Sequence, residues 1–399
     1  MHVRSLALTD FRNYASAQLE LSPGPTVFVG PNGQGKTNLV EAVNFLATLG
    51  SHRVSTDSAL VRGEQPAAII RARVAYRERE VLLEAQINRS GANRAQINGA
   101  QAKPRELTRY ASSVLFAPED LQLVRGDPAA RRRFLDELLV QRQPRYAGVI
   151  ADYERVLRQR STLLKSARAS GLKGNALSTL DVWDERLVGF GSELSDARAA
   201  LVAELAEPAA HAYSRIVGAD HGLTLRHLPG IDRGPADSED QDERDVSRGT
   251  SASGSTAERF HLALAAARRT ELDRGLTLVG PHRDELRLEL NGLPAKGYAS
   301  HGESWSFALA LRLASAELLR ADHPGGDPVL ILDDVFAELD SGRRRRLGEA
   351  VLGYEQILVT AAVGEDVPEL GGASIVRIAA GRIEGAERVS SAQREGERA

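Results

Sequence analysis

The hydrophobic positions near the N-terminal end of the chain change from one period to another. A run of β-branched and aromatic residues at 26–29 predicts a short buried strand. After Lys36 the apolar residues recur every three or four positions, which predicts a helix that ends near Gly50. Glycines and polar residues separate the two runs. The pattern therefore predicts a strand, a glycine-rich loop and a helix in succession.

Short apolar runs elsewhere predict further strands. Those in the first third of the chain suggest an antiparallel sub-sheet, because Asn98-Gly99 is typical of a two-residue hairpin turn. Asn291-Gly292 repeats the hairpin signal after an alternating run of leucines. The strand-like runs are residues 6–11, 69–76, 81–87, 114–116 and 329–332.

From Pro128 the apolar spacing becomes helical. Residues 229–256 are acidic and rich in serine and glycine, with almost no apolar positions, so they are expected to form a disordered loop. Residues 381–399 are polar and are expected to form a flexible tail. The helical stretches are expected at residues 128–140, 146–169, 181–217 and 257–274.

Composition narrows the class of protein. With 399 residues, 42% hydrophobic and 26% charged, the chain is typical of a globular protein of two or three domains. It has no cysteine, which excludes disulfides and thiolate metal sites and fits a cytoplasmic location. No apolar signal core or run of about 18 apolar residues occurs, so no membrane span is expected. Net charge is −3, so nucleic-acid binding would need a local basic patch.

The glycine-rich loop carries a phosphate-binding motif. Residues 30–37 fit G-x-x-x-x-G-K-[ST], between the strand and the helix that such a loop requires. Its glycines let backbone N–H groups turn toward one anion, Lys36 supplies a charge for the β- and γ-phosphates, and the Thr37 hydroxyl suits Mg²⁺. The alternative is a glycine turn without a ligand. The residues expected to bind ATP are Gly30, Pro31, Asn32, Gly33, Gln34, Gly35, Lys36 and Thr37.

The apolar run at residues 329–332 ends in Asp333 and Asp334. The carboxyl end of a buried parallel strand faces the ligand crevice of an open α/β sheet. Asp333 is therefore expected to hold Mg²⁺ together with Thr37, and Asp334 to orient or deprotonate the attacking water. Lys36 and Asp334 are the predicted catalytic residues. The alternative is that the aspartates only begin a turn.

The separation of these motifs predicts the domain organisation. Lys36 and Asp333 lie 297 positions apart (333 − 36), which indicates a large unit inserted between two halves of one ATPase sheet. Residues 1–125 are expected to form the first half of an ATPase head and residues 275–380 the second. Residues 126–274 would then form a helical arm.

Two further motifs lie after and within the long insertion. Ser300, Gly302 and Glu303 begin a predicted helix, where Ser300 and Glu303 can form a capping box or, with Gly302, an anion site for the γ-phosphate held by a partner subunit. The segment 337–340 would cross the same interface. Arg131, Arg132 and Arg133 begin the basic arm and are expected to contact DNA. The alternative for these arginines is a solvated helix face.

Together the motifs resemble the ATP-binding-cassette class. Phe11-Arg12-Asn13-Tyr14 favours its SMC-like repair branch, and further blocks resemble the RecF family of bacterial recombination and repair proteins. The resemblance covers roughly residues 1 to 370. It implies an α/β P-loop head with a mixed parallel sheet, an antiparallel sub-sheet and an inserted helical arm. The further blocks are residues 30–37, 51–53, 117–121, 280–284 and 300–303.

The resemblance also implies a function. It implies a DNA-dependent ATPase that uses ATP and Mg²⁺, with Arg12 and Asn13 beside the nucleotide. Such proteins form an ATP-dependent homodimer on double-stranded DNA near single-strand gaps and junctions. They act with RecR and RecO to load RecA in recombinational repair and replication-fork maintenance.

The chain departs from the cassette pattern at three places. Asp334 stands where cassettes usually carry glutamate, and residues 361–363 contain no switch histidine. His301 and Glu303 replace other small or amide residues. We therefore expect slow hydrolysis, with His301 of a partner subunit as one substitute for the missing histidine.

Three other functions compete with this interpretation. A transporter subunit is disfavoured by the large basic insertion, and DNA-stimulated ATPase activity would separate the two. A P-loop kinase for a small molecule would give a phosphorylated product and would not need Ser300 to Glu303. A structural module would bind ATP and barely hydrolyse it.

Overall fold

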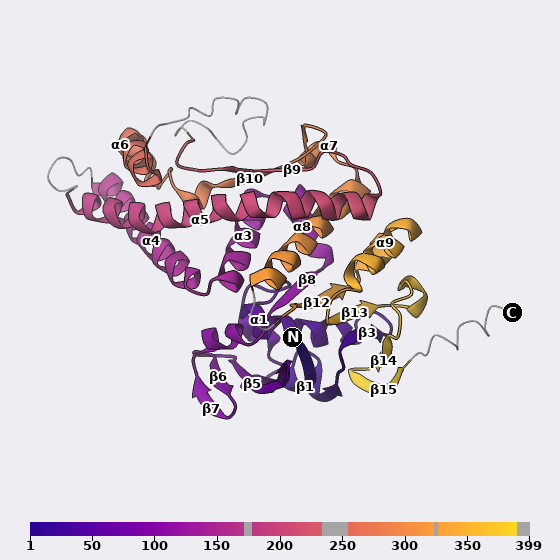
Figure 1. The fold of residues 1–399 in the computed structure, drawn as a ribbon. Helices are drawn as coiled ribbons and strands as arrows, with labels where there is room; N and C mark the ends of the chain where they lie inside the picture. Colours follow the sequence, from indigo (N-terminus) through magenta and orange to yellow (C-terminus); the bar gives the residue numbers. More distant parts are fainter. Residues whose placement is uncertain (171–177, 234–253, 323–325, 389–399) are drawn as a thin grey trace. The chain divides into compact units, whose positions relative to one another are not determined.

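The computed structural model describes residues 1–170, 178–233, 254–322 and 326–388, which form two compact units (Figure 1). Unit 1 comprises Met1–Leu121, Pro208–Asp220 and the chain from Ser300 onward. Unit 2 comprises Gln122–Glu207 and His221–Ala299. Helix α5 (Ser178–Val217) contributes residues to both units and stays helical through Pro208.

The predicted boundaries need two corrections. Residues 275–299 were expected in the ATPase head but belong to unit 2, because β10 (Glu285–Leu290) pairs antiparallel with β9 (Thr224–Leu228). Residues 208–220 were expected in the helical arm but belong to unit 1, where Tyr213 packs edge-on against Phe307. Neither contact could be predicted from the local periodicity of the sequence, because each joins residues far apart in the chain.

Unit 1 contains a six-stranded sheet that is parallel except at one edge. The strand order is β15-β14-β3-β13-β12-β8, and only β15 runs antiparallel to its neighbour. All five residues of β12 are buried, as expected for a strand covered on both faces. The strands are β3 (Gly24–Val29), β8 (Ser113–Phe116), β12 (Val329–Asp333), β13 (Gln356–Ala361), β14 (Ser374–Ala379) and β15 (Arg382–Arg388).

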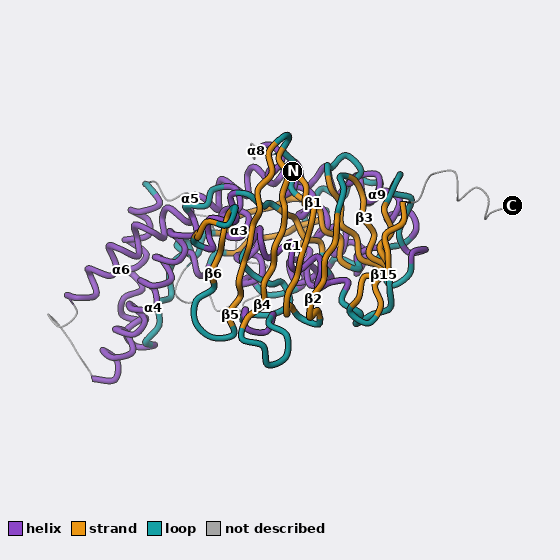
Figure 2. Tube along the Cα trace, turned by 90° about the horizontal axis from the view of Figure 1, so that it is seen from below, coloured by secondary structure: helices purple, strands orange, loops and turns teal. Residues whose placement is uncertain are grey.

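The predicted antiparallel sub-sheet is also present in unit 1, with strand order β2-β1-β4-β5-β6-β7. Figure 2 shows its strands side by side. Asn98 and Gly99 have φ of 51° and 79°, the positive values that a type I′ hairpin turn requires. The strands are β1 (His2–Phe11), β2 (Tyr14–Glu20), β4 (Ala67–Tyr76), β5 (Arg79–Asn88), β6 (Arg94–Ile97) and β7 (Ala100–Ala102).

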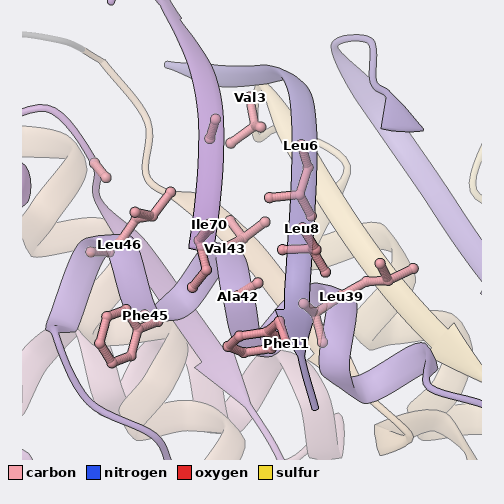
Figure 3. Close-up of a cluster of buried hydrophobic side chains, with 14 of the residues drawn as sticks. Val3, Leu6, Leu8, Phe11, Leu39, Ala42, Val43, Phe45, Leu46 and Ile70 are labelled. Carbon is pink, nitrogen blue, oxygen red and sulfur yellow. The ribbon is translucent and has the colours of Figure 1, made fainter. Parts of the chain in front are cut away.

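Helix α1 (Lys36–Thr48) packs between the two sheets. Its apolar side chains Leu39 and Val43 face those of β1 (Figure 3), and Leu46 belongs to the same buried cluster. The same buried cluster includes Phe28 of β3 and Ile331 of β12. Each such side chain contributes roughly 1.5–3 kcal/mol by leaving water. This burial fixes the start of α1, and therefore the loop that precedes it.

The remaining elements of unit 1 are helical. Helix α8 (His301–Asp322) follows the predicted capping box, and its Arg312 pairs with Asp120 at 2.6 Å. Helix α9 (Ser341–Val351) was not predicted from the sequence. The short helices are η1 (Asp57–Leu60), η2 (Pro104–Arg109), η3 (Pro118–Asp120), α2 (Leu121–Arg125), whose last four residues lie in unit 2, η6 (Val335–Glu338) and η7 (Gly364–Asp366).

Unit 2 is mainly helical, as expected. The fully buried Arg160 of α4 bonds Asp184 of α5 and Glu271 of α6, each at 2.6 Å, which ties three helices together. The elements of unit 2 are α3 (Pro128–Arg142), α4 (Tyr146–Ser170), the first part of α5, β9, α6 (Thr256–Arg274), η5 (Pro281–Arg283), β10, β11 (Leu293–Pro294) and α7 (Ala295–Tyr298). No helix in the described parts of the chain is long and apolar enough to cross a membrane.

The predicted C-terminal tail is wrong in its first part. Residues 382–388 form β15, which pairs with β14 after a turn at Ala380 and Gly381, both with positive φ. The paired strand covers the edge of β14. Residues 389–399 lie outside the described residues, as do residues 234–253 of the predicted disordered loop.

Candidate functional site

The phosphate loop depends on its glycines. Gly35 precedes α1 with φ of 109°, and a Cβ there would lie 2.6 Å from the Asn13 side chain. A Cβ on Gly30 would lie 2.1 Å from the carbonyl oxygen of Ile378. No side chain caps the start of α1, so its first N–H groups can bind an anion.

Lys36 is folded back over this loop. Its Nζ donates to the carbonyl oxygens of Gly30 and Pro31, at 2.7 and 3.2 Å, and to Oδ1 of Asn32 at 3.3 Å. Lys36 is almost fully buried. A buried ammonium ion held by neutral oxygens is suited to a strong anion such as a phosphate.

The turn between β1 and β2 supports the loop from one side. Asn13 Nδ2 donates to the Gln34 carbonyl oxygen at 3.1 Å, and Asn38 Nδ2 donates to Asn13 Oδ1 at 2.8 Å. The Tyr14 hydroxyl donates to the Gly35 carbonyl oxygen at 3.1 Å. Burial raises the pKa of Tyr14 to about 12, so it remains a neutral donor. Asn13 lies against the loop at Gln34, and contact of either residue with a nucleotide stays a prediction, whereas the supporting roles of Tyr14 and Asn38 were missed.

Arg12 lies near the loop but is engaged elsewhere. It donates to both carboxylate oxygens of the buried Glu41, at 2.8 and 2.6 Å, and to the Ala59 carbonyl oxygen at 3.2 Å. Burial alone would raise the pKa of Glu41, but hydrogen bonds from Arg12 and Ser51 outweigh it and lower that pKa. A direct contact between Arg12 and nucleotide stays a prediction, and the Arg12–Glu41 pair was missed.

The segment after α1 returns along the helix to the loop. Leu49 ends α1 in the left-handed conformation and reverses the chain. Ser51 then donates to Glu41 at 2.6 Å, and Arg53 donates to Asn38 at 2.9 Å. His52 Nε2 lies 3.9 Å from Oδ2 of Asp333. Residues 51–53 therefore lie beside α1 and Asp333.

Asp333 lies at the end of β12, within reach of α1. Its Oδ1 accepts hydrogen bonds from Thr37 at 2.9 Å and from Thr360 at 2.5 Å. Burial raises the pKa of Asp333, and the two hydroxyl groups oppose that rise. Asp334 follows in the left-handed conformation, and its backbone N–H donates to Thr360 at 3.0 Å. Asp333 therefore makes side-chain contacts that a turn alone would not require, whereas the role of Asp334 stays a prediction.

Thr360 was missed because its position depends on strand order. Strand β13 lies between β3, which leads into the phosphate loop, and β12. Its C-terminal end therefore lies beside Asp333. The one feature of the sequence that could have indicated this role is a hydroxyl residue directly after the apolar run 357–359.

This pair of oxygen ligands fits Mg²⁺. Thr37 and Asp333 offer a hydroxyl and a carboxylate, both hard donors, next to a phosphate loop. Among the described residues there is no group of three or more His, Cys, Asp or Glu side chains that could hold a metal ion alone. Mg²⁺ commonly needs only one or two protein ligands when phosphates and waters supply the rest.

The capping box at α8 forms as predicted. The Ser300 backbone N–H donates to Glu303 at 2.8 Å, and the Glu303 backbone N–H donates to the Ser300 hydroxyl at 3.3 Å. Gly302 leaves room for Arg343 of α9, because a Cβ there would lie 2.2 Å from Nη1. His301 lies 3.8 Å from Glu338. Residues 300–303 and the segment 337–340 therefore lie next to each other in unit 1.

The three arginines predicted to bind DNA lie in different environments in unit 2. Arg131 is buried and bonds both carboxylate oxygens of Glu285, which does not fit an exposed phosphate contact. Arg132 donates to the Asp284 carbonyl oxygen at 2.8 Å. Arg133 is exposed and pairs with Glu137 one turn away. A DNA contact stays a prediction, and this geometry favours it only for Arg133.

The chain is similar to known proteins over almost its whole length. Residues 2–379 match the family described as the RecF/RecN/SMC N terminal domain. The DNA replication and repair protein RecF of Leifsonia xyli subsp. xyli is 60% identical over 96% of this chain and 99% of its own length. The protein of that name from Clavibacter michiganensis is 62% identical over 96% of each chain.

Solved structures of RecF proteins share this fold over almost the whole chain. The recombination mediator protein RecF with ATPrS superposes with a TM-score of 0.81 and 26% identity over 98% of both chains. A RecF–ATP structure gives a TM-score of 0.80 at the same identity and coverage. An Smc head bound to the C-winged helix domain of ScpA shares the fold alone, with a TM-score of 0.54, 14% identity and coverage of 99% of this chain and 100% of that chain. The chain therefore belongs to the RecF family of SMC-like ATPases.

Proposed function

We propose that the protein is a DNA-dependent ATPase that dimerises with ATP on double-stranded DNA near single-strand gaps and acts in DNA repair and replication. The observation that carries the proposal is the contact of Thr37 with Asp333 beside the uncapped phosphate loop. The names of the relatives, DNA replication and repair protein RecF, support the biological role.

The chain's own groups account for ATP binding. The N–H groups at the start of α1 and the Lys36 ammonium would hold the phosphates, with Lys36 exchanging its bonds to Gly30 and Pro31 for phosphate oxygens. Thr37 and Asp333 would hold Mg²⁺, which neutralises phosphate charge when bound. Asn13 and Tyr14 keep the loop in its binding shape.

Asp334 would accept the proton of the attacking water. Aspartate reaches less far than the glutamate usual in cassettes, and residues 361–363 offer no side-chain donor to the γ-phosphate. Loss of one preorganised contact to developing charge typically slows turnover about a hundred- to a thousandfold. We therefore expect turnover far below the roughly 10 per second typical of enzymes. If His301→Ala leaves the rate unchanged, a trans-acting His301 is excluded.

Dimerisation would bring Ser300 and Glu303 of one subunit to the γ-phosphate bound by the other. This second anion site would make the dimer dependent on ATP rather than ADP. On DNA the dimer would act as a slow clamp in the cytoplasm, together with RecR and RecO, to load RecA. A slow ATPase suits a clamp because its ATP-bound state must persist.

Sedimentation velocity tests the proposal. Wild type should sediment as a dimer only in the presence of Mg²⁺ and ATP. Addition of duplex DNA should raise the sedimentation coefficient further. Lys36→Met should stay monomeric under all these conditions, because the phosphate charge loses its main cation. Phosphate release should rise when DNA is added. An ATP-independent dimer, or release that ignores DNA, would overturn the proposal.

A further inference from the structure

His52 holds two buried nitrogen atoms that the contacts described so far do not explain. Within the part of the chain that the structure describes, neither Nδ1 nor Nε2 has a hydrogen-bond partner. A neutral imidazole always carries one donor and one acceptor nitrogen. Each buried polar group left unpaired costs about 1–3 kcal/mol. A bound group or water at this position would remove that cost.

The carboxylate of Asp333 lies near the ring. The distance of 3.9 Å from Nε2 to Oδ2 is too long for a direct hydrogen bond, and Nε2 is buried from solvent, so a bond between the two requires the ring to move closer to the carboxylate. The other oxygen, Oδ1, already accepts from Thr37 and Thr360. His52 therefore faces the one carboxylate oxygen that these two hydroxyls leave open.

The backbone of His52 is held firmly. The Ser51 hydroxyl accepts from the N–H groups of Arg53 and Val54, at 3.0 and 3.2 Å, and donates to Glu41. Glu41 is in turn fixed by Arg12. This chain of bonds orients the segment against α1. These bonds therefore fix the backbone segment that carries the imidazole.

We propose that His52 is a positioning residue for the metal–nucleotide site: when the site is loaded, its Nε2 donates to Oδ2 of Asp333, fixes that oxygen and so sets the affinity for Mg²⁺ in the presence of ATP. The inference rests on the proposed function, because it assumes that Asp333 and Thr37 hold Mg²⁺. Removal of groups that orient metal ligands typically costs 10–100-fold in metal affinity. A histidine that merely fills space would have no such effect.

The test measures binding of a fluorescent ATP analogue as Mg²⁺ is added, and again in EDTA. His52→Phe keeps the ring volume but cannot hydrogen-bond, so its half-saturating Mg²⁺ concentration should rise about 10–100-fold. His52→Gln, which can still donate a hydrogen bond, should recover most of the affinity. Binding in EDTA should be the same for all three proteins. The exposed His261 of unit 2 supplies the matched control His261→Phe.

Three outcomes would overturn the inference. Equal Mg²⁺ midpoints for wild type and His52→Phe would show that the imidazole does not act on the metal site. An equal loss with and without Mg²⁺ would show that His52 only supports the loop. A His52→Gln protein as weak as His52→Phe would exclude the hydrogen bond. A failure of the proposed ATP site can be told apart from a failure of this inference. In that case wild type would bind the ATP analogue no better than Lys36→Met does.

Discussion

Arg131 and Glu285 form a bidentate ion pair between α3 and β10, with N–O distances of 2.6 and 2.8 Å. Arg131 also donates to the carbonyl oxygens of Leu123 and Gly126. Arg131→Glu should therefore destabilise unit 2, by about 3–5 kcal/mol for a buried pair that loses one partner. Urea unfolding measures this loss. A fully stable variant that only fails to bind DNA would contradict the structural role.

Arg133 gives the contrasting case, because it is exposed and pairs only one turn away on its own helix. Arg133→Glu should leave stability unchanged but weaken DNA binding and flatten its salt dependence by about 0.9 in log–log slope for the lost contact. The matched control is Arg345→Glu, since Arg345 of α9 is exposed and lies near Glu349 in the same spacing. If both variants gave the same slope of log affinity against log salt concentration, Arg133 would not contact DNA and would be only an exposed residue on a solvated helix face.

Asp334→Asn should separate ATP binding from hydrolysis. The Asp334 backbone, held by Thr360, is unchanged by the substitution, so nucleotide affinity should stay near that of wild type. The amide cannot accept the proton of water, so single-turnover hydrolysis should slow at least about a hundredfold. The ATP-bound dimer should accumulate in sedimentation. Unchanged single-turnover hydrolysis would reject Asp334 as the base.

Ser300→Arg should separate ATP binding from dimerisation. The substitution removes one bond of the capping box, which costs roughly 1 kcal/mol, and places a large cation at the proposed interface. ATP binding by the monomer should persist while the ATP-dependent dimer is lost. Ser300→Ala is the control, because it removes the same cap without adding bulk. A dimer that still forms with Ser300→Arg would contradict the interface.

His282 should make unit 2 sensitive to mild acid. Burial lowers the pKa of His282 to about 4, with the charges of Arg283 and Arg132 acting in the same direction, against an ordinary value of 6.5. Between pH 6.5 and 4 the unfolded chain takes up a proton there and the folded chain does not. Stability should therefore fall as pH drops through this window, by up to about 3 kcal/mol.

His282→Gln tests that assignment. Its free energy of unfolding should vary less between pH 6.5 and 4 than that of wild type, although it loses the bond with Tyr153 at all pH values. Identical pH profiles would assign the acid sensitivity to other groups.

Local patterns predicted the parts of the site that depend on neighbours in sequence. The phosphate loop, Asp333 and the Asn98-Gly99 hairpin belong to this group, because turn chemistry and periodicity act over a few residues. The position of Thr360 and the Arg12–Glu41 pair could not be predicted in this way, because they depend on strand order and on the return of residues 49–53.

The same reason explains the wrong boundaries. Residues 285–290 alternate like any strand, and only their pairing with β9 assigns them to unit 2. Residues 382–388 are polar enough to suggest fraying, yet β14 offers them an unpaired edge. Arg131 carries no signal of burial in its sequence context, because its partner lies 154 positions away.

The position of β13 between β3 and β12 has a consequence for how the chain folds. Gly24 of β3 pairs with Gln356 of β13, 332 positions later (356 − 24), and β12 joins β3 only through β13. Contacts at such separation form slowly, because a long loop must close before they stabilise anything. During synthesis the ribosome must therefore release residues 356–361 before the two halves of the nucleotide site can meet. Until then both edges of β3 lack a partner, because its other neighbour, β14, lies still later in the chain, and unpaired strand edges favour aggregation of the nascent protein.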